Sequence, residues 1–96
     1  MVRLVLASPI AAATRGDREI EVDFEGTLKE LFEVVANEYG RQFEQRILEG
    51  NGALRRFVNV YVNGEDARFL DGLDTRIPRD ATVDLLPAIS GGCGEP

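Results

Sequence analysis

Residues 27–39 carry the feature that most restricts how this chain can fold, one strongly amphipathic helix with a defined start. Thr27 is a good N-cap residue, and Glu30 stands three positions later, which is the spacing of a capping box. Gly40 follows as a residue suited to the C-cap. The apolar residues recur at helical spacing and predict one stripe that packs on a sheet: Leu28, Leu31, Phe32, Val35 and Tyr39.

The segments before this helix predict a β-hairpin. Residues 2–7 are mostly valine and leucine, as in a buried strand, and Pro9 interrupts them. Residues 19–24 alternate between apolar and acidic side chains, which is typical of a half-buried strand. Residues 11–17 contain a glycine and polar side chains and predict the turn between the two strands.

The segments after the helix predict more strands. Residues 41–54 are expected to form a short helical turn and a flexible loop. Residues 57–64 form the strongest strand candidate, because β-forming residues lead into a hairpin-type turn at Asn63–Gly64. The remainder predicts, in order, a short return strand at 66–70, a winding loop at 71–80 with Leu73 and Ile77 as inward anchors, and a last strand at 82–89.

This order of elements predicts one α+β domain with a ubiquitin-like β-grasp, in which one main helix lies across a mixed sheet. A ferredoxin-like fold would need two full helices at regular places, and the second helix here is too weak. We expect the domain to span residues 1–89 and residues 90–96 to form a flexible C-terminal tail, because small and glycine residues there cannot offset the entropy of ordering.

The composition favours a binding or carrier protein over an enzyme. The 96 residues include no histidine, which removes the usual general base and most metal ligands, and one cysteine, which allows no internal disulfide. A formal charge of −6 argues against a nucleic-acid partner. No apolar stretch approaches the ~20 residues of a membrane helix. We expect no bound metal or cofactor, no nucleic-acid or membrane partner, and a cytoplasmic location.

Residues 55–92 join a strand, a winding loop and a last strand that runs through "LLPAIS" into Gly91–Gly92. With the pieces "RFVNVYVNGEDARF" and "GLDTRI", this half of the chain resembles the ubiquitin-like sulfur-carrier proteins of the ThiS/MoaD family. It is most similar to their cysteine-biosynthesis, CysO-like branch. The hairpin and helix of residues 1–39 fit the same template more loosely.

The resemblance implies a carrier. In this family an ATP-dependent adenylating enzyme activates a C-terminal glycine carboxylate, sulfur displaces AMP, and the glycine thiocarboxylate delivers sulfide to an acceptor on a second enzyme. On this chain the reactive carbonyl is that of Gly92, and Ser90, Gly91 and Gly92 form the tail that threads into partner active sites. The expected partners are the adenylating enzyme, which uses the ATP, and a sulfur-accepting enzyme such as a PLP-dependent cysteine-synthase-like protein.

The glycines also suit this role on physical grounds. Glycine has no Cβ, so it passes through a narrow channel and leaves the carboxyl carbon unhindered. Pro87 lacks an N–H and should end regular strand pairing. The alternative to a functional role is that these glycines belong to an ordinary frayed C-terminus.

The chain departs from the family pattern after Gly92, because Cys93–Gly94–Glu95–Pro96 follow it. We interpret these residues as a removable cap, cut between Gly92 and Cys93 by a JAMM-type zinc metalloprotease. Thiol or persulfide chemistry at Cys93 is disfavoured, because no nearby cation lowers the pKa of its thiol. A cloning scar is a third origin for these residues.

Four apolar residues are candidates for docking the adenylating enzyme on an exposed sheet face: Phe69, Leu70, Leu85 and Ile89. Core burial is the alternative for Leu85, because alternation puts Val83, Leu85 and Pro87 on one face and Asp84, Leu86 and Ala88 on the other. Three other functions remain open: the small subunit of molybdopterin synthase, the sulfur donor for the thiamine thiazole, and, from a different class, a β-grasp protein modifier or interaction module.

Overall fold

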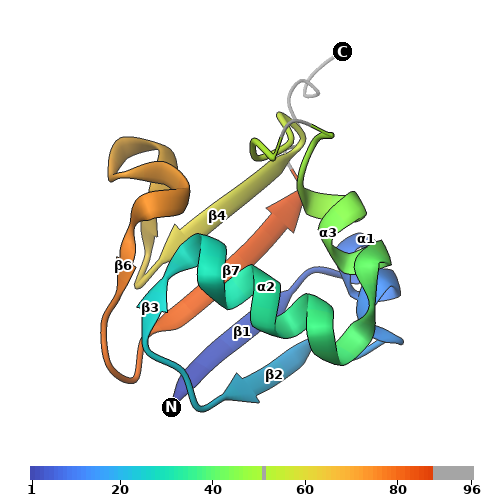
Figure 1. Ribbon diagram of the computed structural model, residues 1–96, viewed down its shortest axis with the longest axis horizontal. Coiled ribbons are helices and arrows are strands. Elements are labelled where there is room, and N and C mark those ends of the chain that lie inside the picture. The colour runs from blue at the N-terminus through green and yellow to red at the C-terminus, as the bar shows by residue number, and fades with distance from the viewer. Residues whose placement is uncertain (51, 88–96) are drawn as a thin grey trace.

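The computed structural model describes residues 1–50 and 52–87, and it shows five strands in one mixed sheet (Figure 1). The strand order is β2-β1-β7-β4-β5, so the last strand lies at the centre. β7 runs parallel to β1 and antiparallel to β4, while β1 pairs antiparallel with β2. The strands of this sheet are β1 (Val2–Leu6), β2 (Glu19–Val22), β4 (Val58–Val62), β5 (Glu65–Asp66) and β7 (Thr82–Pro87).

The expected hairpin is present, since Val2 lies opposite Val22 and Leu4 opposite Ile20. Two short strands, β3 (Gly26–Thr27) and β6 (Arg76–Ile77), form a separate antiparallel pair. The helices are α1 (Ser8–Ala11), α2 (Leu28–Tyr39) and α3 (Arg41–Ile47). This arrangement confirms the predicted β-grasp, a mixed sheet with one main helix across it.

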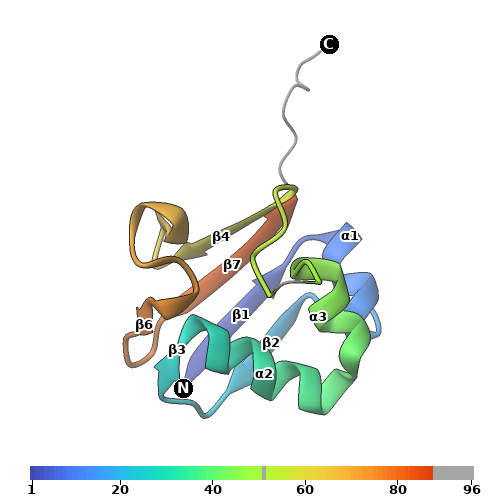
Figure 2. The same cartoon turned by 45° about the horizontal axis from the view of Figure 1, so that its top comes forward.

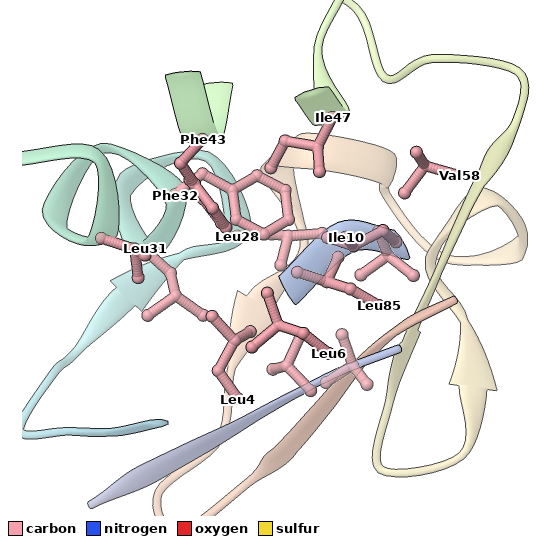
Figure 3. Close-up of a cluster of buried hydrophobic side chains, with 14 of the residues drawn as sticks. Leu4, Leu6, Ile10, Leu28, Leu31, Phe32, Phe43, Ile47, Val58 and Leu85 are labelled. Carbon is pink, nitrogen blue, oxygen red and sulfur yellow. The ribbon is translucent and has the colours of Figure 1, made fainter. Parts of the chain in front are cut away.

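The core lies between α2 and one face of the sheet. Alternate residues of β1, β4 and β7 point toward the helix and are buried, and the apolar stripe of α2 meets them (Figure 3). The rings of Phe32 and Phe43 pack edge to face with centroids 6.0 Å apart, which joins α3 to α2. Burial of this set of side chains is the main source of stability in a domain this small.

The predicted capping box of α2 is confirmed. The Glu30 backbone N–H donates to Thr27 Oγ1 at 3.3 Å, and the Thr27 backbone N–H donates to Glu30 Oε1 at 2.9 Å. Gly40 ends the helix with φ of +104°, a region that side chains disfavour. The pKa of Glu30 is lowered, chiefly because its carboxylate accepts the Thr27 backbone hydrogen bond.

Three local predictions were wrong. Residues 11–17, expected as a turn, are largely helical: α1 begins with Pro9 in its first turn, which suits a proline, and a 3₁₀ turn follows at Ala12–Thr14. The expected strand at 66–70 is only the two-residue β5 followed by a 3₁₀ turn at Ala67–Phe69, because Asp66 caps that turn by accepting from the Arg68 N–H.

The third difference concerns residues 41–54, where the expected helical turn is the two-turn helix α3, held by the buried side chains of Phe43 and Ile47. The winding loop at 71–80 contains the expected anchors, with Ile77 buried and Leu73 half-buried. In the part of the chain that the structure describes, no helix is long and apolar enough to span a membrane.

Candidate functional site

The last described strand, β7, lies at the centre of the sheet and ends beside the loop that leads from α3 into β4 (Figure 2). Near this end, Leu85 lies opposite Leu6 of β1, and Pro87 lies opposite Val58 of β4. The Ala7 N–H donates to the Leu85 carbonyl at 3.0 Å. Because β7 is paired on both sides, the tail starts from one of the most firmly held strands in the molecule.

The residues predicted to carry the sulfur chemistry lie outside the described residues. These are Ser90, Gly91 and Gly92. Cys93, which follows the predicted cleavage site, and the docking candidate Ile89 also lie outside the described residues. Pro87 stands five positions before Gly92. At about 3.4 Å per extended residue, the reach from Pro87 to Gly92 is at most about 17 Å. An enzyme that acts on Gly92 must therefore approach the end of β7 closely.

The face of the sheet opposite the core carries charged side chains on β1 and β2 and an exposed leucine near the end of β7. On β1, Arg3 pairs with Glu19 at 3.0 Å and with Glu21 at 3.7 Å. On β7, Leu86 projects from this face and is 40% exposed. Leu86 lies opposite Asn59 of β4. Leu86 is thus an exposed apolar side chain one residue before Pro87, the last residue of β7.

The structure separates the four predicted docking residues. Phe69 and Leu70 are exposed, at 88% and 38%, so both are available to a partner. The prediction for Leu85 was wrong, because its side chain is fully buried in the core. Leu86 and Phe57, the latter 68% exposed, were missed as docking candidates. For Leu86 the signal was present in the alternation of the last strand.

Arg68 braces the 3₁₀ turn that carries Phe69. Its guanidinium donates to Asn59 Oδ1 at 2.8 Å and to the backbone carbonyls of Val58 at 2.9 Å and Arg55 at 3.0 Å. One side chain therefore ties the turn after β5 to the start of β4. This contact holds the exposed Phe69 in a defined place relative to the sheet.

A groove of about 550 Å³ adjoins the end of β7 on the helical side of the sheet. Its polar rim comes from α3 and the following loop, and its apolar floor comes from α1, β4 and β7. The lining residues are Pro9, Ile10, Gln42, Gln45, Arg46, Arg55, Phe57, Val58 and Pro87. The two arginines give this groove a positive charge, whereas the whole chain carries a formal charge of −6.

Titratable groups with shifted pKa values have structural partners. Burial and a 2.8 Å hydrogen bond to Asp17 raise the pKa of Tyr39. The hydrogen bond and charge of the N-terminal ammonium group lower the pKa of Asp80. Within residues 1–50 and 52–87, no group of three or more potential ligands could hold a metal ion.

A ubiquitin-like β-grasp whose central, last strand delivers a Gly-Gly tail defines a class of small carrier and modifier proteins. A family model described as the ThiS family matches residues 4–92, so the match covers nearly all of the chain and includes Gly91 and Gly92. The chain belongs to the ThiS family.

Three related proteins illustrate the similarity. The sulfur carrier protein CysO of Mycobacterium tuberculosis is 56% identical over 41 residues, which is 43% of this chain and 44% of that protein. Its crystal structure superposes with a TM-score of 0.82 at 32% identity, covering 92% of this chain and 99% of that one. A chain of the BexX/CysO complex from Amycolatopsis orientalis gives a TM-score of 0.84 at 30% identity, covering 96% and 100%. SAMP1 of Haloferax volcanii gives 0.73 at 25% identity, covering 95% and 98%.

Proposed function

We propose that this protein is a sulfur carrier that works through a thiocarboxylate on Gly92. The observation that carries the proposal is the position of β7: the strand that leads into Gly91–Gly92 is the central strand of the sheet, paired with β1 up to Leu85 and with β4 up to Pro87. Partner enzymes then bind the folded domain, and the short segment after Pro87 reaches into their active sites.

The chemistry requires a free carboxylate on Gly92. The carboxylate attacks the α-phosphorus of ATP on the adenylating enzyme, which forms an acyl-adenylate and releases pyrophosphate. A sulfide equivalent then attacks the acyl carbon, AMP leaves, and a thiocarboxylate remains. The protein supplies the carboxylate and its placement, while the enzyme supplies ATP binding and charge stabilisation. Because this step consumes ATP, the proposal places the protein in the cytoplasm.

The chain as it stands is a precursor under this proposal. In this chain the Gly92 carbonyl belongs to an amide with Cys93, so Gly92 has no free carboxylate. An amide is a poor electrophile and lacks a leaving group that sulfide could displace. Cleavage between Gly92 and Cys93 by a JAMM-type zinc metalloprotease creates the required carboxylate.

The acceptor of the sulfur is a biosynthetic enzyme. Two recipients fit the chemistry: a PLP-bound aminoacrylate, which gives cysteine, and an electrophilic intermediate of another sulfur-containing metabolite. The likeness to CysO supports the first recipient, and the likeness to a chain of the BexX/CysO complex supports a carrier that binds a partner protein. A molybdopterin synthase subunit and a thiamine-thiazole donor would use the same Gly92 group with different acceptors.

The test compares chains 1–92 and 1–96, each incubated with the adenylating enzyme, ATP and sulfide. Intact-mass spectrometry should show that the shorter chain exchanges one oxygen for sulfur. The longer chain should remain unchanged until the protease is added. Equal thiocarboxylation of both chains, or sulfur on Cys93, would contradict the precursor role.

A second candidate function is covalent protein modification, which the likeness to SAMP1 supports. Activation of Gly92 is the same in both functions, and only the nucleophile that attacks the acyl group differs. The amine of a target lysine gives a stable isopeptide bond, whereas sulfide gives a thiocarboxylate. Digestion of cell extracts for peptides with a lysine-linked C-terminal remnant of this chain separates the two functions.

A further inference from the structure

The groove beside the end of β7 contains two arginines from different elements. Arg46 lies in the last turn of α3, and Arg55 lies in the loop that leads into β4. Arg55 is placed by two hydrogen bonds: its Nε donates to the Gln45 carbonyl at 2.8 Å, and its N–H donates to the Ile47 carbonyl at 2.9 Å. The groove therefore presents a guanidinium group whose position is set before any partner binds.

Neither arginine forms an ion pair within the described residues, and no aspartate or glutamate lines the groove. By contrast, Arg3 on the open face is paired with two glutamates. A planar guanidinium binds a carboxylate through two parallel hydrogen bonds. Two arginines without ion-pair partners can therefore recognise acidic side chains. The charge of the groove is opposite to that of the chain as a whole.

The rest of the groove is apolar, with Phe57 exposed at its edge and Pro9 and Pro87 among its lining residues. Aromatic and arginine side chains together are typical of positions that contribute most to protein–protein binding. The groove also adjoins Pro87, and the reach from Pro87 to Gly92 is at most about 17 Å. An enzyme that holds Gly92 in its active site therefore lies close enough to contact this groove.

We infer that this groove docks an acidic segment of the activating enzyme, with carboxylates on Arg46 and Arg55 and an apolar side chain against Phe57. The inference rests on the proposed function, because it takes the activating enzyme as the partner. The acyl-adenylate is open to hydrolysis until sulfide attacks, so a second contact at the base of the tail keeps the carrier bound through both steps. This contact is separate from the open face that carries Leu86.

The test measures the affinity of chain 1–92 for the adenylating enzyme by calorimetry, and the KM of the chain in ATP–pyrophosphate exchange. Arg46→Gln and Arg46→Glu should weaken binding about tenfold or more and raise KM, with kcat unchanged, because charge-assisted hydrogen bonds are lost. The salt dependence of binding should become shallower. Arg55→Gln should act in the same direction, and Arg46→Lys should restore part of the affinity.

The control is Arg79→Gln. Arg79 is an exposed arginine in the loop before β7, and its replacement changes the net charge by the same amount as Arg46→Gln. Its affinity should match that of the unaltered chain. Equal weakening by Arg79→Gln would overturn the inference, as would normal binding by Arg46→Glu. Binding of unaltered 1–92 without thiocarboxylation would contradict the proposed function alone, whereas no binding at all would overturn both. A further outcome compares the two chain lengths. If 1–96 binds the enzyme more weakly than 1–92, and Arg46→Gln removes that difference, then Glu95 or the Pro96 carboxylate occupies the groove. That result also overturns the inference.

Discussion

Leu85 and Leu86 are adjacent on β7, yet their side chains lie on opposite faces of the sheet: Leu85 is fully buried in the core, and Leu86 is 40% exposed on the open face. The two residues have the same side chain and the same strand but different environments. They therefore offer a matched pair for separating stability from docking.

Leu85→Ala should lower the free energy of unfolding by about 2–5 kcal/mol, because it opens a cavity beneath α2. Leu86→Ala should change stability by about 0.5 kcal/mol or less, as expected at an exposed position. Leu86→Ala should weaken binding of the adenylating enzyme instead. Urea unfolding and calorimetric titration measure the two effects, and a large loss of stability in Leu86→Ala would contradict the assignment of faces.

Arg68→Ala should release the 3₁₀ turn at Ala67–Phe69 from β4, because three hydrogen bonds are lost. We expect a stability loss of about 1–2 kcal/mol, since each exposed hydrogen bond contributes little by itself. Phe69→Ala removes only the exposed ring and should leave unfolding unchanged. Both variants should weaken docking if Phe69 contacts the partner, and normal docking by both would remove Phe69 from the interface.

Glu30→Gln tests the charge in the capping box of α2, since glutamine can still accept the Thr27 N–H hydrogen bond. The pKa of Glu30 is lowered in the folded chain from 4.5, chiefly by that backbone bond. A lowered folded pKa means that the charge contributes stability above the unfolded pKa and that the contribution is lost as the pH falls through the folded value. The stability difference between the two chains should therefore be present at pH 7 and vanish in acid. A difference that persists at pH 2 would show that geometry, not charge, is responsible.

Gly92→Val in chain 1–92 should suppress thiocarboxylation strongly while leaving the fold intact. A branched side chain beside the carboxylate obstructs both the enzyme channel and the attack of sulfide on the acyl carbon. Ser90→Ala keeps a small side chain and serves as the control, with near-normal activity. Intact-mass spectrometry measures the product, and normal conversion of Gly92→Val would remove the need for glycine at this position.

The modifier function can be tested through Lys29, since it is the only lysine in the chain. Lys29 is exposed in the first turn of α2, so a second activated copy could acylate it. If the protein forms chains of itself through lysine, Lys29→Arg should abolish every linkage to a lysine side chain. Conjugates on other proteins should be unaffected. Tryptic peptide mapping distinguishes these products from acylation of the N-terminal amine.

The elements that the sequence predicted well are those with strong local signals. The capping box at Thr27 and Glu30 and the alternation of residues 19–24 each specify one conformation, and the structure contains both. The error at residues 11–17 falls where tertiary contacts decide the conformation. Residues 11–17 look like a turn by composition, but burial of Ala11, Ala13 and Thr14 holds them in a helical conformation.

The candidate site divides in the same way. Gly91 and Gly92 could be proposed from the sequence, because they follow the last predicted strand at a short spacing. The groove was not evident, because Arg46 comes from α3 and Arg55 and Phe57 come from the loop before β4, and only the fold brings them beside the end of β7. No short-range pattern connects an arginine in the last turn of α3 with the end of β7.

The parallel pairing of β1 with β7 joins the first strand of the domain to its last. Leu4 and Val83 are partners separated by most of the sequence, so the sheet cannot close until nearly the whole chain has been synthesised. A nascent chain that stops short of β7 lacks both the central strand and the segment that follows it. Under the proposed function, the fold thereby couples the completeness of the polypeptide to the presentation of Gly92 to an activating enzyme.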